Sequence, residues 1–332
     1  MIQDIKLEPI LDSIRFEEMS DERYFSSEFS EYISNSKLSL INPSQGGSPE
    51  KYLAGIKQSV SDSLTLGSAV HQLVLQPEEF EIAEGIERPT AKMGAMADEL
   101  FKIYKQGKSI KDIDIIDASN KIGYYKDKMT DKRINDVLSQ CQQYWKDRLL
   151  WESKECIKEP IYLDMKSREK LAQCLTSVEQ CKAIQNLLHP EGFLTEPIIL
   201  NEAALFIDIK ASYKDKETVL KIKGKLDNFT IDNGDIVLND LKTTGHYIDQ
   251  FKESFENYHY YRQIALYGWM LKLYAKAYHN IDKITSFTAN MLLVSTIPTY
   301  KAGIYKVSKS AVNKGFTELV DLLKRVAALE LL

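Results

Sequence analysis

Several features that would set the chain apart from ordinary globular proteins are scarce or missing. Its 332 residues include only 15 glycines and 9 prolines, which excludes a collagen-like or low-complexity chain. No apolar run approaches the roughly 20 residues that span a bilayer. The N-terminus lacks the basic and apolar regions of a secretory signal. We therefore expect a cytoplasmic globular protein with no membrane partner.

The chain has no excess of positive charge and few cysteines. The net charge is −5 at pH 7, which argues against non-specific coating of nucleic acid. It does not exclude a metal site, which needs carboxylates, or a local basic strip. The spacing of the cysteines matches neither a zinc site nor an iron–sulfur cluster, so we expect free thiols and no cluster. These cysteines are Cys141, Cys156, Cys174 and Cys181.

Hydrophobic periodicity divides the chain into three regions. The first sixty residues suggest short helices broken by turns, and Ser61–Gln76 has the apolar spacing of a helix. From 93 to 188 the sequence is helical in character, without strand-like alternation. We predict a helical N-terminal part (1–92), a helical insertion (93–190) and a catalytic core (191–332). The order of elements indicates an α/β or α+β fold.

The C-terminal region alternates apolar and polar residues in the way β-strands do. Three or four antiparallel strands are expected between 193 and 243, with a tight turn at Asn233-Gly234. Helices are expected at 247–256, 260–278 and 308–329. Strands are expected at 286–295 and 303–307.

Two of these strands carry the residues that indicate chemistry. A hairpin between 221–229 and 236–243 would bring Asp227 and Asp240 together, with Lys242 two residues further on. Two adjacent carboxylates repel each other unless a cation lies between them. Oxygen ligands favour Mg²⁺ or Mn²⁺. The pattern therefore predicts one or two divalent ions beside a fixed ammonium group.

An Asp-x-Lys triplet alone has little specificity. The chain contains several, and Asp208-Ile-Lys210 also lies in an expected strand. Only Asp240-Leu-Lys242 has an upstream aspartate on the preceding strand and a distinctive helix downstream.

Taken in order, five motifs resemble the PD-(D/E)xK nuclease superfamily, most of all the phage-type exonucleases of the exonuclease VIII (RecE) family. The resemblance runs from about residue 30 to the C-terminus, apart from 93–188. It implies a restriction-endonuclease-like core, in which helices flank a mixed central sheet. The motifs are Gly67–His71, Glu196–Ile199, Gly224–Asp227, Asp240–Thr244 and Gln263–Tyr267.

The resemblance also implies roles for individual residues. His71, Asp227, Asp240 and the carbonyl of Leu241 would bind metal, Lys242 would be the catalytic lysine, and Glu196 would be the first acidic residue. Gln263 and Tyr267, one helical turn apart, would face the site. Four of these residues have a structural alternative: a core histidine for His71, an exposed strand-start residue for Glu196, and a polar stripe or core aromatic for Gln263 and Tyr267.

Contacts with DNA are expected from Lys221, Lys223 and Lys225, which alternation places on the face of Asp227. Arg262 lies in a tyrosine-rich stretch that could stack on bases, although ordinary core and surface packing explains such a stretch better.

The function expected from the resemblance is Mg²⁺- or Mn²⁺-dependent exonucleolytic hydrolysis of linear double-stranded DNA in phage-type recombination or replication. A 5′→3′ polarity, a homo-oligomer, and an annealing protein or recombinase partner are implied, with the host cytoplasm as location if a phage encodes the protein. A structure-specific endonuclease and a catalytically silent protein that binds DNA ends stay open as alternatives.

Overall fold

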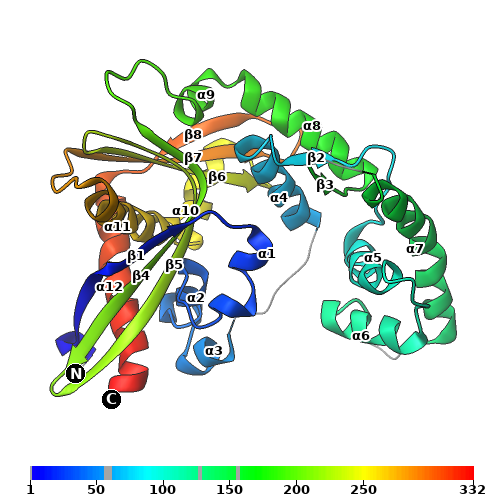
Figure 1. Cartoon of the computed structure of the whole chain (residues 1–332), viewed down its shortest axis with the longest axis horizontal. Coiled ribbons are helices and arrows are strands. Elements are labelled where there is room, and N and C mark those ends of the chain that lie inside the picture. Colours follow the sequence, from blue (N-terminus) through cyan, green and yellow to red (C-terminus); the bar gives the residue numbers. More distant parts are fainter. Residues whose placement is uncertain (1, 56–61, 126–128, 155–157) are drawn as a thin grey trace. The chain divides into compact units, whose positions relative to one another are not determined.

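The computed structural model describes residues 2–55, 62–125, 129–154 and 158–332 (Figure 1). The chain divides into two compact units. One consists of Met1–Lys57 and Glu179–Leu332, and the other of Gln58–Val178. The predicted insertion at 93–190 thus falls mostly in the second unit, which also contains the helix of the histidine motif.

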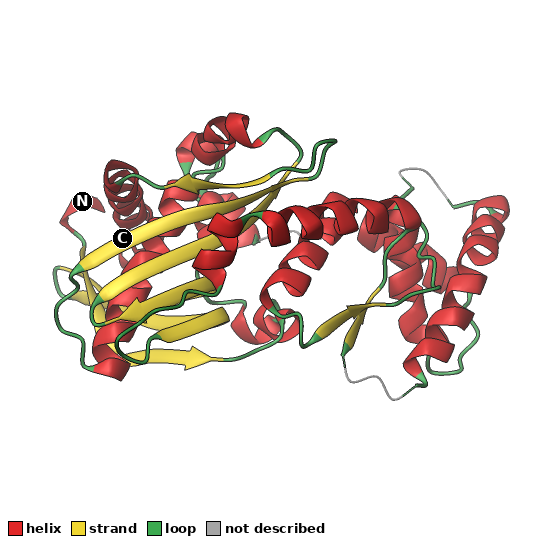
Figure 2. Ribbon diagram, turned by 90° about the horizontal axis from the view of Figure 1, so that it is seen from above, coloured by secondary structure: helices red, strands yellow, loops and turns green. Residues whose placement is uncertain are grey.

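A six-stranded sheet forms the centre of the first unit (Figure 2). Its order is β1-β4-β5-β6-β7-β8, and all neighbours are antiparallel except β6 and β7, which are parallel. The predicted mixed α/β fold with helices flanking a central mixed sheet is confirmed. The strands are β1 (Lys6–Glu17), β4 (Ile198–Tyr213), β5 (Lys216–Asp232), β6 (Asp235–Thr244), β7 (Ser286–Ser295) and β8 (Ala302–Lys306).

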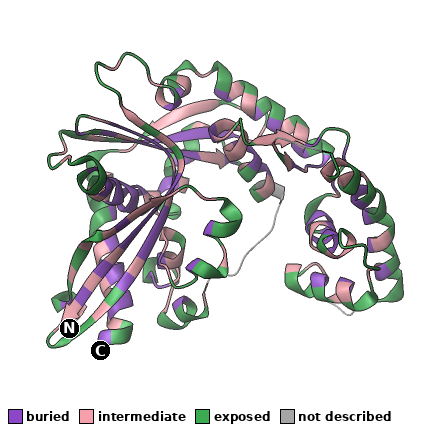
Figure 3. Cartoon of the chain, in the orientation of Figure 1, coloured by how far each residue is buried: buried purple, intermediate pink, exposed green. Residues whose placement is uncertain are grey.

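Two long helices, α11 (Tyr260–His279) and α12 (Lys309–Leu331), pack on one face of this sheet and enclose the main core. Buried residues concentrate in the strands and along α11 (Figure 3). Aromatic residues of α1 and η2 cover part of the other face. The remaining elements are η1 (Ile2–Asp4), α1 (Asp21–Tyr24), η2 (Ser27–Phe29), α2 (Asn35–Ser39), η3 (Pro43–Gln45), α3 (Pro49–Ala54), α9 (Lys182–Leu188), η4 (Ile248–Gln250) and α10 (Phe251–Asn257).

The turn between β5 and β6 forms where it was predicted. Asn233 and Gly234 both have positive φ, at 47° and 92°. Positive φ at both central residues suits a two-residue hairpin, and it is why Asn-Gly favours one. A side chain at Gly234 would also come within 2.6 Å of the Lys283 carbonyl oxygen. This turn sets the register of the strands that carry Asp227 and Asp240.

The prediction of helix before residue 60 is wrong at β1, a twelve-residue edge strand that pairs with β4. Its apolar residues Leu7, Ile10, Leu11 and Ile14 are spaced as on a helix. An irregularity in the pairing between Ile10 and Arg15 produces this spacing, because it interrupts the strand alternation.

The second unit is mainly helical and has its own core, built around α5 and α7. The predicted helix Ser61–Gln76 is observed as α4, although Ser61 lies outside the described residues. The expectation of no strand between 93 and 188 is wrong, because β3 pairs with β2 in a short parallel ladder. Three-residue strands are too short to give a periodic signal. The elements are α4 (Asp62–Leu75), β2 (Phe80–Ile82), α5 (Ala91–Tyr104), α6 (Asp112–Ile122), α7 (Asp131–Glu152), β3 (Glu159–Ile161) and α8 (Met165–Gln180).

Cys141, Cys174 and Cys181 are thiols, as expected, with no disulfide among the described residues, and Cys156 lies outside those residues. In the described part of the chain, every helix is too short or too polar to cross a bilayer.

Candidate metal and catalytic site

The candidate site lies where β5 and β6 separate. Their ladder runs from Asp232↔Asp235 to Asn228↔Asn239, and the next residues, Asp227 and Asp240, follow directly after it. The backbone N–H of Leu241 donates a hydrogen bond to Asp227 Oδ2 at 2.7 Å, so the two strands stay linked as they part. The predicted convergence of the two aspartates is therefore observed.

Lys242 lies beside both carboxylates. Its Nζ is 2.5 Å from Asp240 Oδ2 and 4.0 Å from Asp227 Oδ2. Burial opposes its positive charge, but the attraction of Asp240 and then Asp227 is stronger, so the pKa of Lys242 is raised. Lys242 is therefore a fixed ammonium group at neutral pH.

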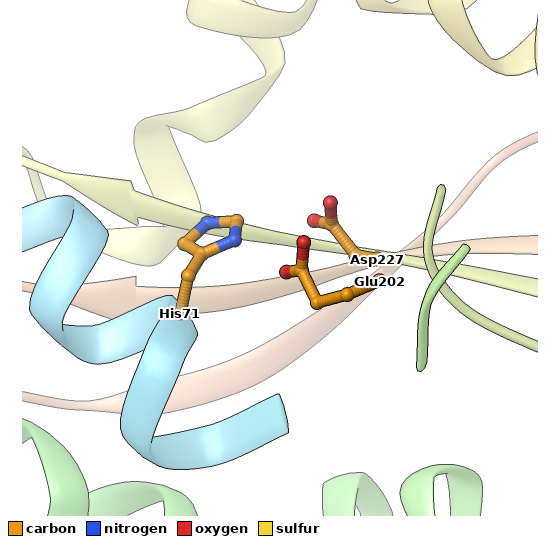
Figure 4. Close-up of side chains that lie close together, drawn as sticks. All are labelled: His71, Glu202 and Asp227. Atoms are coloured by element: carbon orange, nitrogen blue, oxygen red, sulfur yellow. The ribbon is translucent and has the colours of Figure 1, made fainter. Parts of the chain in front are cut away.

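A third carboxylate, which was not predicted from the sequence, belongs to Glu202 on β4. Oxygen atoms of Glu202 and Asp227 lie within 4.8 Å of each other, and Figure 4 shows the two groups side by side. Glu202 stands opposite Asp227 in the β4–β5 ladder, between the pairs Asn201↔Asn228 and Ala203↔Leu226. The two-residue turn at Lys214-Asp215 fixes this register, so counting back from that turn would have identified Glu202.

Glu196, predicted as the first acidic residue, does not join the cluster. It precedes the first residue of β4 and is exposed, six positions before Glu202. The prediction is wrong because Glu196 lies just before the start of β4, whereas Asp227 stands opposite a residue further along that strand, Glu202.

The sheet is irregular at this point. Gly224 and Phe229 on β5 both face α11, since Gly224 abuts Tyr267 and the Phe229 ring contacts Tyr274. Five positions separate them, so the alternation slips by one residue in between. On β4, Glu202 has a φ of 50°, which is strained for a side chain of this type. The carboxylates of Glu202 and Asp227 therefore project from the place where the regular pleat is broken.

Lys225 holds Glu202 in place. Its Nζ is 2.8 Å from Glu202 Oε2 and 2.5 Å from Asp21 Oδ1, and its side chain is 10% exposed. Burial opposes its charge, but Glu202 and Asp21 together raise its pKa. Lys225 thus supports a site carboxylate instead of presenting its charge to a ligand.

Lys223 is 7% exposed and donates to the backbone carbonyl of Tyr24 at 2.7 Å, so its predicted contact with DNA is wrong. Burial, with the nearby charge of Lys37, lowers its pKa to about 8. Alternation places it on the expected face, but α1 covers that face. Lys221 remains accessible and pairs with Glu31 at 3.1 Å, so its role stays a prediction.

Gln263 and Tyr267 both face the site from α11, as predicted. Gln263 Nε2 donates to Asp240 Oδ1 at 2.8 Å. Burial, together with Tyr24 and the two aspartates, raises the pKa of Tyr267 well above its usual value, so it stays a neutral phenol. The close approach of Tyr267 requires a glycine at position 224, where a Cβ would lie 2.9 Å from the ring.

Arg262 is fully buried, which contradicts its predicted contact with DNA. Its guanidinium donates to Glu318 Oε1 at 2.8 Å and to Ser39 Oγ at 2.7 Å, and it also contacts Asn35 and Gln45. It points inward from α11 and joins this helix to α2 and α12. Its neighbour Gln263 is the residue of this helix that turns toward Asp240.

Two further sequence candidates are His71 and Lys210. His71 is on α4 in the second unit and is half-buried, so its role as a metal ligand stays a prediction. In the alternative Asp-x-Lys triplet, Lys210 pairs with Glu217 at 2.8 Å across the β4–β5 hairpin. That ion pair is away from the three clustered carboxylates.

The residues of the cluster fit a divalent cation. Four carboxylates (Asp21, Glu202, Asp227 and Asp240) share two ammonium groups (Lys225 and Lys242), so these six side chains carry a net charge of −2. Within the described residues, Asp240 Oδ2 is buried and accepts no hydrogen bond of normal geometry, although Lys242 lies close. A carboxylate-rich donor set of this kind suits Mg²⁺ or Mn²⁺ better than a softer metal.

No family profile and no curated protein sequence matches the chain. Among solved structures it is similar to a Eubacterium rectale protein provisionally named an exonuclease, with a TM-score of 0.48 and 12% identity, covering 94% of this chain and 86% of that one. It is also similar to Scheffersomyces stipitis Rai1, with a TM-score of 0.23, 9% identity, and 97% and 80% covered. A third is protein VC1899 from Vibrio cholerae, with a TM-score of 0.18, 12% identity, and 96% and 58% covered.

Proposed function

We propose that the chain is a metal-dependent deoxyribonuclease of the PD-(D/E)xK type that hydrolyses phosphodiester bonds from the ends of linear double-stranded DNA. The observation that supports this most is the convergence of Glu202, Asp227 and Asp240 with Lys242 at the point where β5 and β6 separate. A silent DNA-binding protein has no use for this combination.

Glu202, Asp227 and Asp240 would hold the metal, together with the backbone carbonyl of Leu241. The sequence resemblance adds His71 to this set. When bound, Mg²⁺ or Mn²⁺ would polarise a phosphoryl oxygen and acidify a water molecule.

The chain's own residues supply the remaining functions. The Lys242 ammonium, held by Asp240 and Asp227, can orient the attacking water and stabilise negative charge that develops on the phosphate. Gln263 fixes the second carboxylate oxygen of Asp240. Tyr267, kept neutral, can donate a hydrogen bond without adding charge.

A groove of about 490 Å³ adjoins the site at Gln263 and offers a path for a DNA strand. Its lining includes Ser36, Lys51, Tyr258 and Tyr260. Tyr258 is 62% exposed, so its ring is available for stacking. This groove replaces Lys223 and Arg262 as the proposed DNA contact.

The test uses linear duplex DNA labelled at the 5′ or 3′ end, and closed circular DNA as control, each with Mg²⁺, Mn²⁺ or EDTA. We expect metal-dependent release of 5′-terminal nucleotides from linear DNA only. Cleavage of the circle would indicate an endonuclease instead, and no cleavage of any substrate would contradict a nuclease. The 5′→3′ polarity, the oligomer and a recombination partner rest on the sequence resemblance and belong to the same proposal.

A further inference from the structure

A row of asparagines crosses four strands next to the candidate site. Asn290 on β7 donates to Asn239 on β6 at 2.9 Å, and Asn239 donates to Asn228 on β5 at 2.7 Å. Asn228 in turn donates to Asn201 on β4 at 2.7 Å. All three bonds run in the same direction, from amide nitrogen to amide oxygen. We call these four residues the asparagine ladder.

Three members of the ladder are direct chain neighbours of the site carboxylates. Asn201 precedes Glu202, Asn228 follows Asp227, and Asn239 precedes Asp240. On β6 the two neighbours point to different sides, since Asn239 also bonds to the Leu187 carbonyl of α9 while Asp240 bonds to Gln263 of α11. A shift of any of these three residues is therefore passed directly to a carboxylate.

The ladder lies at the end of the β5–β6 pairing, where the strands are held together least firmly. Asn228↔Asn239 is the last backbone pair before β5 and β6 separate, and strand pairs fray from such ends. Asn228 and Asn239 are both fully buried. Their side chains can meet in this register only, because a slip of one residue would turn them to opposite faces.

Stability alone does not account for these amides. Buried polar groups lose their hydration, and a pair replaced by apolar groups of the same shape is often neutral or stabilising. A fully bonded polar network instead makes one arrangement unique. We propose that the asparagine ladder is a positioning device that fixes the register of β4, β5 and β6, and so the spacing of Glu202, Asp227 and Asp240. The inference rests on the metal site proposed above.

The test compares two variants. Asn239→Ala breaks the ladder in its middle, and Ile231→Ala removes a buried side chain three residues after Asn228 on β5. Mn²⁺ affinity by calorimetry and hydrogen exchange of the Leu241 amide by mass spectrometry are measured for both variants, along with the melting temperature. We expect Asn239→Ala to weaken Mn²⁺ binding by about 10- to 100-fold, the usual effect of losing a partner that orients a metal ligand. The Leu241 amide, which donates to Asp227, should exchange faster than the loss of global stability alone explains.

Ile231→Ala should lower the melting temperature at least as much and leave Mn²⁺ affinity within about threefold, because core truncation acts on stability. Equal loss of affinity in both variants, or wild-type affinity and exchange in Asn239→Ala, would overturn the proposal. If Asn239→Ala does not fold, Asn290→Ala breaks the ladder at its outer donor and should give a smaller effect of the same kind. If the wild type binds no Mn²⁺, the metal site fails, and exchange at Leu241 alone decides on the ladder.

Discussion

Replacing Glu202 by glutamine should abolish most metal binding, whereas the same change at Glu196 should have no effect. Comparing the two variants distinguishes the metal site observed in the structure, which includes Glu202, from the one predicted by the sequence motif, which includes Glu196. Glu202→Gln keeps the shape of the side chain and changes the net charge of the six-residue cluster from −2 to −1. Glu196 is exposed and stands outside the cluster.

The magnitude follows from the charge lost. Two unit charges 4 Å apart interact by about 4 kcal/mol at an effective dielectric constant of 20, and a divalent cation doubles this to about 8 kcal/mol. Each 1.4 kcal/mol is about a factor of ten. Part of that energy is offset by the lower desolvation of a neutral amide, so we expect Mn²⁺ affinity to fall by about 10²- to 10³-fold.

The assay is a Mn²⁺ titration followed by calorimetry and, separately, by the cleavage rate of linear duplex DNA. Glu202→Gln should shift both curves to higher Mn²⁺, and Glu196→Gln should superimpose on the wild type. Wild-type curves for Glu202→Gln, with loss of binding in Glu196→Gln, would refute the assignment based on geometry.

Three further predictions concern neighbouring lysines and one glycine. Lys242→Ala should reduce DNA cleavage by at least about a hundredfold, because it removes a preorganised charge. Lys210→Ala should leave the cleavage rate unchanged. The reverse result would show that Asp208-Ile-Lys210 is the catalytic triplet. Because the pKa of Lys223 is lowered from 10.5 to about 8, its burial costs stability below pH 8, and this cost disappears as the pH rises toward 10.5. In urea unfolding, the free energy of unfolding of Lys223→Met should therefore exceed that of the wild type by up to about 3 kcal/mol at pH 7, and most of this difference should be lost at pH 10. A difference that does not depend on pH would contradict the lowered pKa. Gly224→Ala should destabilise the fold by about 1–3 kcal/mol by overpacking against α11, while Gly245→Ala, with open space around it, should be neutral; equal thermal stability of both variants would rule out the close contact.

The sequence was most informative where local chemistry decides the structure. The Asn233-Gly234 turn, the strand carrying Asp240 and the helix carrying Gln263 all form as predicted, because turn residues and periodicity act over short distances. With the turn and the alternation known, the meeting of Asp227 and Asp240 follows.

Predictions that depended on tertiary packing were less successful. Lys223 and Arg262 are polar side chains that the fold buries, and no local pattern indicates whether another element covers a given face. Glu202 could have been found by counting register from the Lys214-Asp215 turn, whereas its positive φ could not. The helical spacing in β1 arises from an irregularity that only pairing with β4 reveals.

The central claim is that clustered carboxylates hold a metal that cleaves DNA, and Asp240→Asn tests it most directly. Digestion of 5′-labelled linear duplex by this variant and by the wild type should be followed in Mg²⁺, with melting temperatures measured in parallel. We predict rapid release of label by the wild type and at least a hundredfold loss in Asp240→Asn, with the fold retained. Full Mg²⁺-dependent cleavage by Asp240→Asn would contradict the account.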